Sequence, residues 1–134
     1  MGKTEILKIK VRELKLYVEK GFFQDMDDIN VWEEKEIKTA RQNKEQTLHQ
    51  LELKAAEQTK ILRNKFPEGV ADTQYEQVKA QLDEKVRAHR VSIENAFINT
   101  KIQIRETVYS KKTAINKKLD EAKKELEKLN GELK

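Results

Sequence analysis

The stretch that decides the fold is Tyr75 to Asn130, YEQVKAQLDEKVRAHRVSIENAFINTKIQIRETVYSKKTAINKKLDEAKKELEKLN. It contains no proline and no glycine, and its apolar residues recur mostly three or four positions apart. From Ile93 onward the spacing averages about 3.6 residues and mixes heptads with 11-residue blocks, the period of a nearly straight helix. The stretch therefore predicts one helix of roughly 84 Å. Such a helix needs a partner along its apolar stripe.

A second long helix is predicted for about residues 28 to 66, where Trp32, Leu48 and Leu62 belong to a seam with the same steps. The segment that follows contains Pro67 and Gly69, with N-cap candidates at Asp72 and Thr73. A connection this short requires antiparallel neighbours. We therefore predict an all-α fold: an antiparallel helical hairpin, or coiled-coil-like rod, of helices at about 28–66 and 75–130.

The seams of the two helices match in one register. If Phe66 faces Tyr75, the numbers of facing residues add up to about 141. The apolar pairs that this register predicts are Phe66 with Tyr75, Ala55 with Val86, Leu48 with Ile93, Ile37 with Ile104 and Trp32 with Tyr109. Lys44 opposite Phe97 is a mismatch.

Residues 3–20 fit two structures. A helix places four apolar residues on one stripe, whereas a strand alternates apolar with basic residues over Leu7 to Val11. The helix is favoured because Leu14, Leu16 and Val18 break the alternation. We expect Gly21 to end this element and the acidic residues after it to cap the next helix. The predicted organisation is an N-terminal amphipathic element at 1–24 and the long hairpin at 25–134, within a single domain.

The two predicted arms are unequal in length. The apolar seam of the second arm continues to Leu133, past the point that the first arm covers. Either the N-terminal helix prolongs the first arm, or a second copy of the chain covers the remainder. We expect a homo-oligomer.

The amino-acid composition limits the classes of function that the protein can have. Charged residues make up 39% of the 134 residues and hydrophobic residues 37%, which is typical of helices that bury a narrow seam. The chain has no cysteine and no apolar run long enough to cross a membrane. We expect a cytoplasmic protein that is not an enzyme and that has no cofactor, metal, small-molecule substrate or membrane contact.

The leading functional hypothesis is a scaffolding or inhibitor protein that acts through protein–protein contacts and self-association. Aromatic residues are frequent in the segment where the N-terminal element meets the long hairpin, and leucines continue the seam near the C-terminus. The partner-binding residues predicted from these features are Phe22, Phe23, Trp32, Leu119, Leu126 and Leu129.

The alternative is nucleic-acid binding, which basic residues would support through phosphate contacts. Residues 101–118 carry six basic side chains and one acid, among them Lys101, Arg105 and Lys112. The N-terminus, read as a basic strand and a short helix ending at Gly21, resembles the ribbon-helix-helix DNA-binding family. That resemblance covers about the first quarter of the chain. It implies a strand pairing between two chains, with Lys8, Lys10 and Arg12 facing the major groove.

Overall fold

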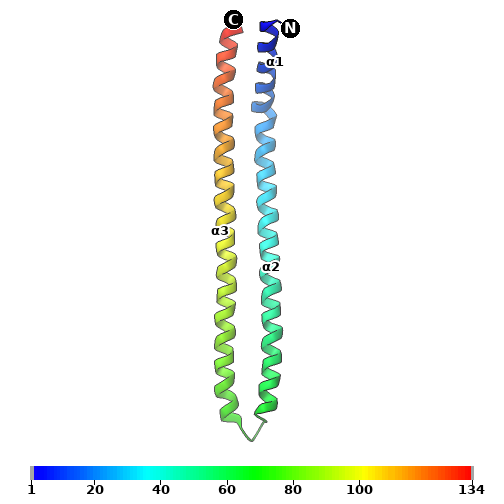
Figure 1. Cartoon of the computed structure of the whole chain (residues 1–134), viewed down its shortest axis with the longest axis vertical. Coiled ribbons are helices and arrows are strands. Elements are labelled where there is room, and N and C mark those ends of the chain that lie inside the picture. Colours follow the sequence, from blue (N-terminus) through cyan, green and yellow to red (C-terminus); the bar gives the residue numbers. More distant parts are fainter. Residues whose placement is uncertain (1, 134) are drawn as a thin grey trace. The chain divides into compact units, whose positions relative to one another are not determined.

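The structure is a computed structural model that describes residues 2–133. Its elements are α1 (Lys3–Leu16), a π-helical turn η1 (Tyr17–Gly21), α2 (Phe22–Lys65) and α3 (Asp72–Leu133). No strand occurs among residues 2–133. The two long helical stretches on either side of the turn pack against each other, so the predicted all-α helical hairpin is confirmed (Figure 1).

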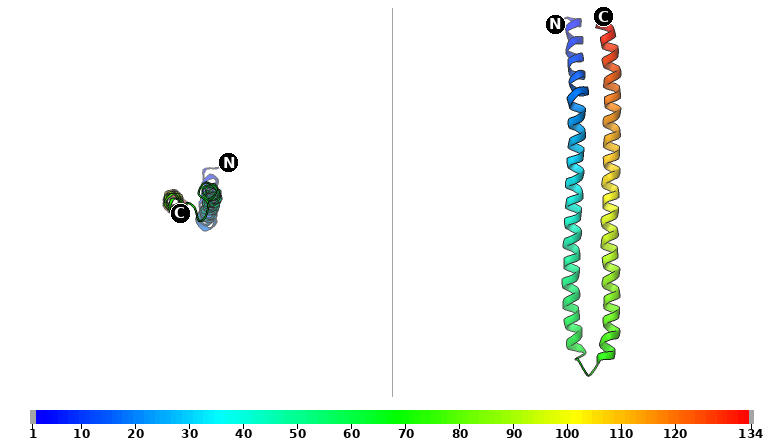
Figure 2. Two further views of the ribbon diagram at one scale, coloured as in Figure 1. Left: turned by 90° about the horizontal axis from the view of Figure 1, so that it is seen from below. Right: turned by 180° about the vertical axis from the view of Figure 1, so that it is seen from behind.

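Two compact units make up the chain. The terminal unit consists of Met1–Glu36 and Gln103–Lys134, and the hairpin unit consists of Ile37–Ile102. Within each unit, a helical segment from the first half of the chain lies beside a segment of α3 in both orientations of the ribbon (Figures 1 and 2).

In the terminal unit, α1 lies on the C-terminal part of the α3 seam. Leu14 and Tyr17 line the same groove as Ala122 and Leu129. The Lys118 ammonium sits 4.4 Å from the centroid of the Tyr17 ring. The favoured helix at the N-terminus is thus confirmed, and it prolongs the first arm. The alternative strand, and with it the DNA-reading ribbon, is wrong because Lys3–Leu16 is helical.

The prediction that Gly21 ends the N-terminal element is wrong. The helix passes through a π-helical turn at Tyr17–Gly21 and continues directly into α2. The Tyr17 ring occupies the space beside Gly21, where a Cβ atom would lie 2.8 Å from Tyr17 Cδ2. The residue is therefore glycine to make room for a ring, not to stop a helix. The expected capping role of the next aspartates is also wrong, since Asp25 lies in the first turn of a helix that has no free start.

One contact agrees with the register predicted for the hairpin unit, whereas at Tyr75 the structure places Arg63 over the ring in place of the predicted Phe66. The Lys44 ammonium lies 4.6 Å from the centroid of the Phe97 ring, at the predicted pairing. The apparent mismatch is therefore a cation–π contact. Both residues are half-buried, and so are Leu48, Leu51, Ala55, Leu82, Val86 and Ile93.

One predicted pair in the terminal unit is wrong. Tyr109 is 74% exposed, and Lys111 instead places its ammonium 3.9 Å from the centroid of the Trp32 ring. Val108, one position before Tyr109, is the buried residue. A difference of one position rotates a side chain by about 100° around a helix, so the seam passes through Val108 and Tyr109 points to solvent.

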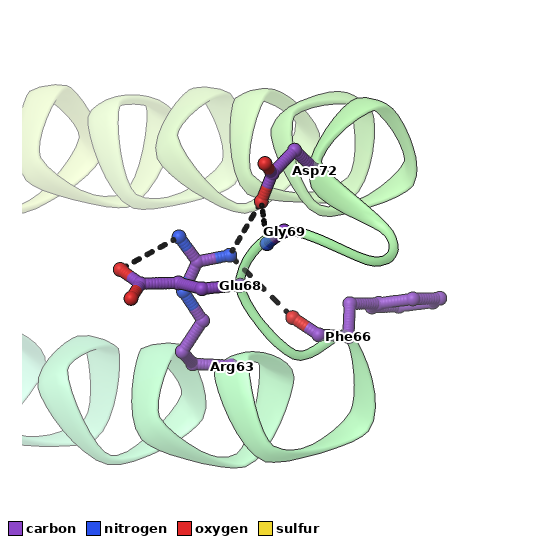
Figure 3. A network of polar contacts seen from close by, with 5 residues as sticks. All are labelled: Arg63, Phe66, Glu68, Gly69 and Asp72. Atoms are coloured by element: carbon purple, nitrogen blue, oxygen red, sulfur yellow. Dashed lines mark hydrogen bonds and ion pairs between the residues drawn. The ribbon is translucent and has the colours of Figure 1, made fainter.

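The turn of the hairpin is fixed by Arg63 (Figure 3). Its guanidinium lies 3.7 Å from the centroid of the Tyr75 ring, donates to the Phe66 carbonyl at 3.4 Å and pairs with Asp72 at 3.7 Å. Asp72 also accepts a hydrogen bond from the backbone N–H of Gly69, which adopts a φ of +78°. The carboxylate of Asp72, the first residue of α3, thus holds the loop. Glycine suits the left-handed backbone of this turn.

The core is thin. The residues less than a tenth exposed within 2–133 are Ile29, Leu62, Ile104, Val108, Ala122 and Leu129. These residues lie on α2 and α3, whereas α1 contains no buried residue. Most side chains beside the buried stripe of α2 and α3 stay near water. No helix within 2–133 has a stretch apolar and long enough to cross a membrane.

We expect Gly21→Ala to lower the free energy of unfolding by about 1–3 kcal/mol, because the new methyl group overlaps the Tyr17 ring. Gly131→Ala is the matched control: Gly131 lies in α3 with open space around its Cβ position. This substitution should stabilise the helix by up to about 1 kcal/mol. Urea unfolding followed by circular dichroism measures both, and stabilisation by Gly21→Ala would contradict the role of the glycine.

Candidate functional site

The candidate site is an open groove between α2 and α3 in the hairpin unit, with a volume of about 500 Å³. We call it the flank groove. Its floor consists of the less exposed lining residues, which are all apolar: Leu51, Ala55, Leu62, Leu82 and Val86. Its rims consist of exposed lining residues: Lys54, Gln58, Ile61 and Lys65 on α2, and Val78, Gln81, Lys85 and His89 on α3.

The spacing of the rim residues explains how the groove arises. On each helix they recur three or four positions apart, so they form one stripe beside the buried seam. Two facing helices bury their seams against each other and leave these neighbouring stripes to flank an open channel. The groove is therefore a direct product of the seam and of its lateral neighbours.

The groove is positively charged. Three of its lining residues are lysines, Lys54, Lys65 and Lys85, and none of the lining residues is acidic. Among the ion pairs formed within residues 2–133, none involves these three lysines. Apolar walls beside unpaired cations favour an apolar ligand that carries negative charge at its edges.

On each helix, the stripe that contains the rim residues of the flank groove continues with uncharged side chains. On α2, Thr47 and Asn43 precede Lys54 by seven and eleven positions; on α3, Ala96 and Thr100 follow His89 by the same steps. Both threonine hydroxyls donate to the carbonyl four residues earlier, at 2.8 Å for Thr47 and 2.9 Å for Thr100. These hydroxyls would keep a hydrogen bond if a partner covered them, which lowers the cost of removing water.

A separate apolar stripe lies on α3 in the hairpin unit. Val91, Ile98 and Ile102 are 44%, 50% and 48% exposed, and their spacing of seven and four positions puts them on one face. None of the three lines the flank groove. The unit thus has two apolar surfaces that the hairpin leaves uncovered.

The aromatic residues predicted to bind a partner differ in exposure. Phe23 is 60% exposed, whereas Phe22 and Trp32 are half-buried. The Phe22 and Phe23 rings meet edge to face, with centroids 5.2 Å apart. The face of Trp32 is covered by Lys111. Phe23 is therefore the residue of this group that offers most surface to a partner.

The predicted leucine surface lies against α1. Leu129 is 5% exposed and shares a groove with Leu14, and Leu119 and Leu126 are half-buried. The terminal unit thus uses these side chains for its own packing.

The predicted nucleic-acid contacts form two groups. Lys101, Arg105 and Lys112 follow one another at steps of four and seven, which is the spacing of one stripe on α3. The three predicted contacts on α1 do not share one face. Lys101 and Lys112 are half-buried, and the Lys101 ammonium lies 5.3 Å from the centroid of the Phe97 ring. Arg105 is exposed. Lys8, Lys10 and Arg12 are exposed too, but on helix α1 successive members of this set are rotated by about 200°. Within residues 2–133, no three His, Asp or Glu side chains are grouped to hold a metal ion.

The rim lysines escaped the sequence-based prediction. A usable signal existed, because Lys54 and Lys65 are eleven positions apart, one full repeat of the seam. The lateral neighbours of a seam become recognisable as a site only when both helices are placed. Comparison with protein-family models, with curated proteins and with solved structures finds no match for this chain.

A buried phenol group, that of Tyr17, lies in the groove of the terminal unit. The Tyr17 hydroxyl is buried and has no hydrogen-bond partner among the described residues. Burial raises the pKa of the Tyr17 phenol above its usual value, and the negative charge of Asp25 raises this pKa further. The folded protein therefore holds the Tyr17 proton more tightly than the unfolded chain does.

We expect the free energy of unfolding to fall as the pH rises above about 10, because the unfolded chain loses the Tyr17 proton first. Tyr17→Phe removes this contribution, and at neutral pH it should leave stability unchanged or slightly raised, since the lost hydroxyl makes no hydrogen bond. Tyr109→Phe, at an exposed site, is the control that keeps the pH dependence. Urea unfolding at several pH values measures the effect, and a clear loss of stability in Tyr17→Phe at neutral pH would contradict it.

Proposed function

We propose that the protein is a non-enzymatic interaction protein that binds a helix of a partner protein in the flank groove. The observation that carries the proposal is the pairing of an all-apolar floor with lysines on both rims. An amphipathic helix lying in a groove between two helices is a common mode of recognition. Scaffolding and inhibitor proteins both work through such contacts.

The groove defines the helix that would fit it. Its α2 side runs from Leu51 to Lys65, about 21 Å of helix, so it accommodates about four turns of a partner. The partner's apolar residues would recur three or four positions apart and contact the floor. Carboxylates on both sides of that stripe would face Lys54 and Lys65 on one rim and Lys85 on the other.

Nucleic-acid binding is the alternative function, and it would rest on exposed cations such as Arg105. Three of the six cations of residues 101–118 support it less well than Arg105 does. Lys101, Lys111 and Lys118 each lie over an aromatic ring of the same chain. A phosphate backbone would have to compete with these rings.

We expect a synthetic helix of about 15 residues, with leucines at helical spacing flanked by glutamates, to bind with a Kd in the micromolar range. Fluorescence anisotropy of the labelled peptide measures this affinity. Val78→Glu, which places a negative charge on the groove rim, should weaken binding at least tenfold.

Leu53→Glu is the matched control, because Leu53 is 58% exposed on α2 and lies outside the groove. Its affinity should equal that of the unchanged protein. Equal binding by Val78→Glu and Leu53→Glu would contradict the assignment of the groove, and so would equal binding of a scrambled peptide with the same composition.

A further inference from the structure

The exposed apolar stripe on α3 in the hairpin unit has the spacing of a coiled-coil seam. Val91, Asn95, Ile98 and Ile102 follow one another at steps of four, three and four, which is a heptad repeat with one polar member. All four side chains are exposed, and we call these four residues the back stripe. None of them lines the flank groove, so a contact made here is separate from the proposed binding of a partner helix.

The back stripe points away from α2. Val91 lies nine positions after Leu82, and Ile102 lies nine positions after Ile93. Leu82 and Ile93 are half-buried residues of the seam that packs against α2. Nine residues make about two and a half turns of helix, so the stripe and the seam lie on opposite sides of α3. The stripe is therefore open to another molecule.

Polar residues flank the back stripe on both sides. Glu94 and Lys101 lie on one side, and Ser92 and Asn99 lie on the other. These are the positions next to a heptad seam, where charges set the partner and the orientation of a coiled coil. Among the ion pairs formed within residues 2–133, none involves Glu94 or Lys101. One flank thus carries a charge of each sign, seven positions apart, and the other flank is neutral.

We propose that the back stripe packs antiparallel against the back stripe of a second copy of the chain, so that the numbers of facing residues add up to 193. This register places Val91 opposite Ile102 of the second copy. It places Asn95 opposite Ile98 of the second copy. Two-fold symmetry repeats both contacts, so one surface that is complementary to itself closes a dimer.

The flanking charges select this register. An antiparallel pairing brings like flanks together, and here Glu94 of each copy lies beside Lys101 of the other. The dimer therefore gains two pairs of opposite charge. Sliding one copy by a heptad in either direction would set Glu94 beside Glu94 of the second copy, or Lys101 beside Lys101.

A parallel pairing matches the charges less well. It brings unlike flanks together, so that Lys101 meets Glu106 of the second copy but Glu94 meets an uncharged residue. It also sets every seam residue opposite its own counterpart. Glu84, seven positions before Val91, would then face Glu84 of the second copy. The antiparallel pairing avoids this repulsion.

The contact is small, so the dimer is a transient one. The back stripe spans about 17 Å of helix, and each copy contributes three apolar side chains. Asn95 lowers the stability of such a seam and restricts its register. We expect a dissociation constant on the order of 10–100 μM.

Charge reversal in the full-length protein tests the register. Glu94→Lys alone brings lysines together in both flanking contacts, and Lys101→Glu alone brings glutamates together. Each single variant should raise the dissociation constant about tenfold or more. The double variant, and an equimolar mixture of the two single variants, should associate like the unchanged protein, because every contact between positions 94 and 101 then joins opposite charges.

Glu57→Lys is the control for charge, because Glu57 is exposed on α2 and lies outside the flank groove. It should leave the dissociation constant unchanged. Sedimentation velocity at about 5 to 500 μM protein measures association, and circular dichroism checks that each variant keeps its helices. Glu94 is exposed, so its variant keeps the test decisive if Lys101→Glu, at a half-buried position, lowers stability.

A charge within the seam tests the apolar part of the contact. Ile98→Asp should leave the protein monomeric over the whole concentration range, because the new carboxylate would face Asn95 of the second copy in a closed seam. Leu53→Asp is the matched control, since Leu53 is 58% exposed on α2. It should associate like the unchanged protein.

An unchanged protein that stays monomeric up to about 500 μM would overturn the inference. So would an Ile98→Asp variant that associates like Leu53→Asp. Weakening by Lys101→Glu without weakening by Glu94→Lys would indicate a parallel pairing and overturn the antiparallel register. Failure of the mixture to associate better than either single variant would overturn this register as well.

Discussion

The width of the apolar stripe constrains everything else in this protein. A sequence in which charged residues make up 39% supplies each helix with one narrow seam, and two helices can bury only the seams that face each other. Six residues within 2–133 are buried as a result. Because the side chains next to a seam are left at the surface, an apolar channel such as the flank groove follows from the same pattern that makes the hairpin.

The seam is completed by residues that are not aliphatic. Lys44 covers Phe97 and Arg63 covers Tyr75 in the hairpin unit, and Lys118 covers Tyr17 in the terminal unit. Long cationic side chains can pack their carbon atoms against rings and keep the charge near water. These contacts fill positions where a regular apolar repeat fails. They also explain why a basic stretch of α3 is compatible with a packed interface.

Much of the fold could be predicted from spacing and breakers. The hairpin follows from two seams separated by Pro67 and Gly69, and the Lys44–Phe97 contact agrees with the predicted register. The role of Gly21 could not be predicted, because glycine signals a helix end locally and only the packed Tyr17 ring shows why the helix continues. The groove was missed for a related reason: its rim lysines become a site only when two helices stand side by side.

The central claim, on the proposed function, is that a helix of a partner protein binds in the flank groove. A single cysteine, introduced into this cysteine-free sequence, reports directly through its rate of alkylation whether the groove is occupied. With Ile61→Cys on the groove rim, the rate should fall at least tenfold when the synthetic helix with leucines flanked by glutamates is added at about 100 times its Kd, while Leu53→Cys outside the groove should react at a constant rate. A rate at Ile61→Cys that the added helix leaves unchanged would contradict the account.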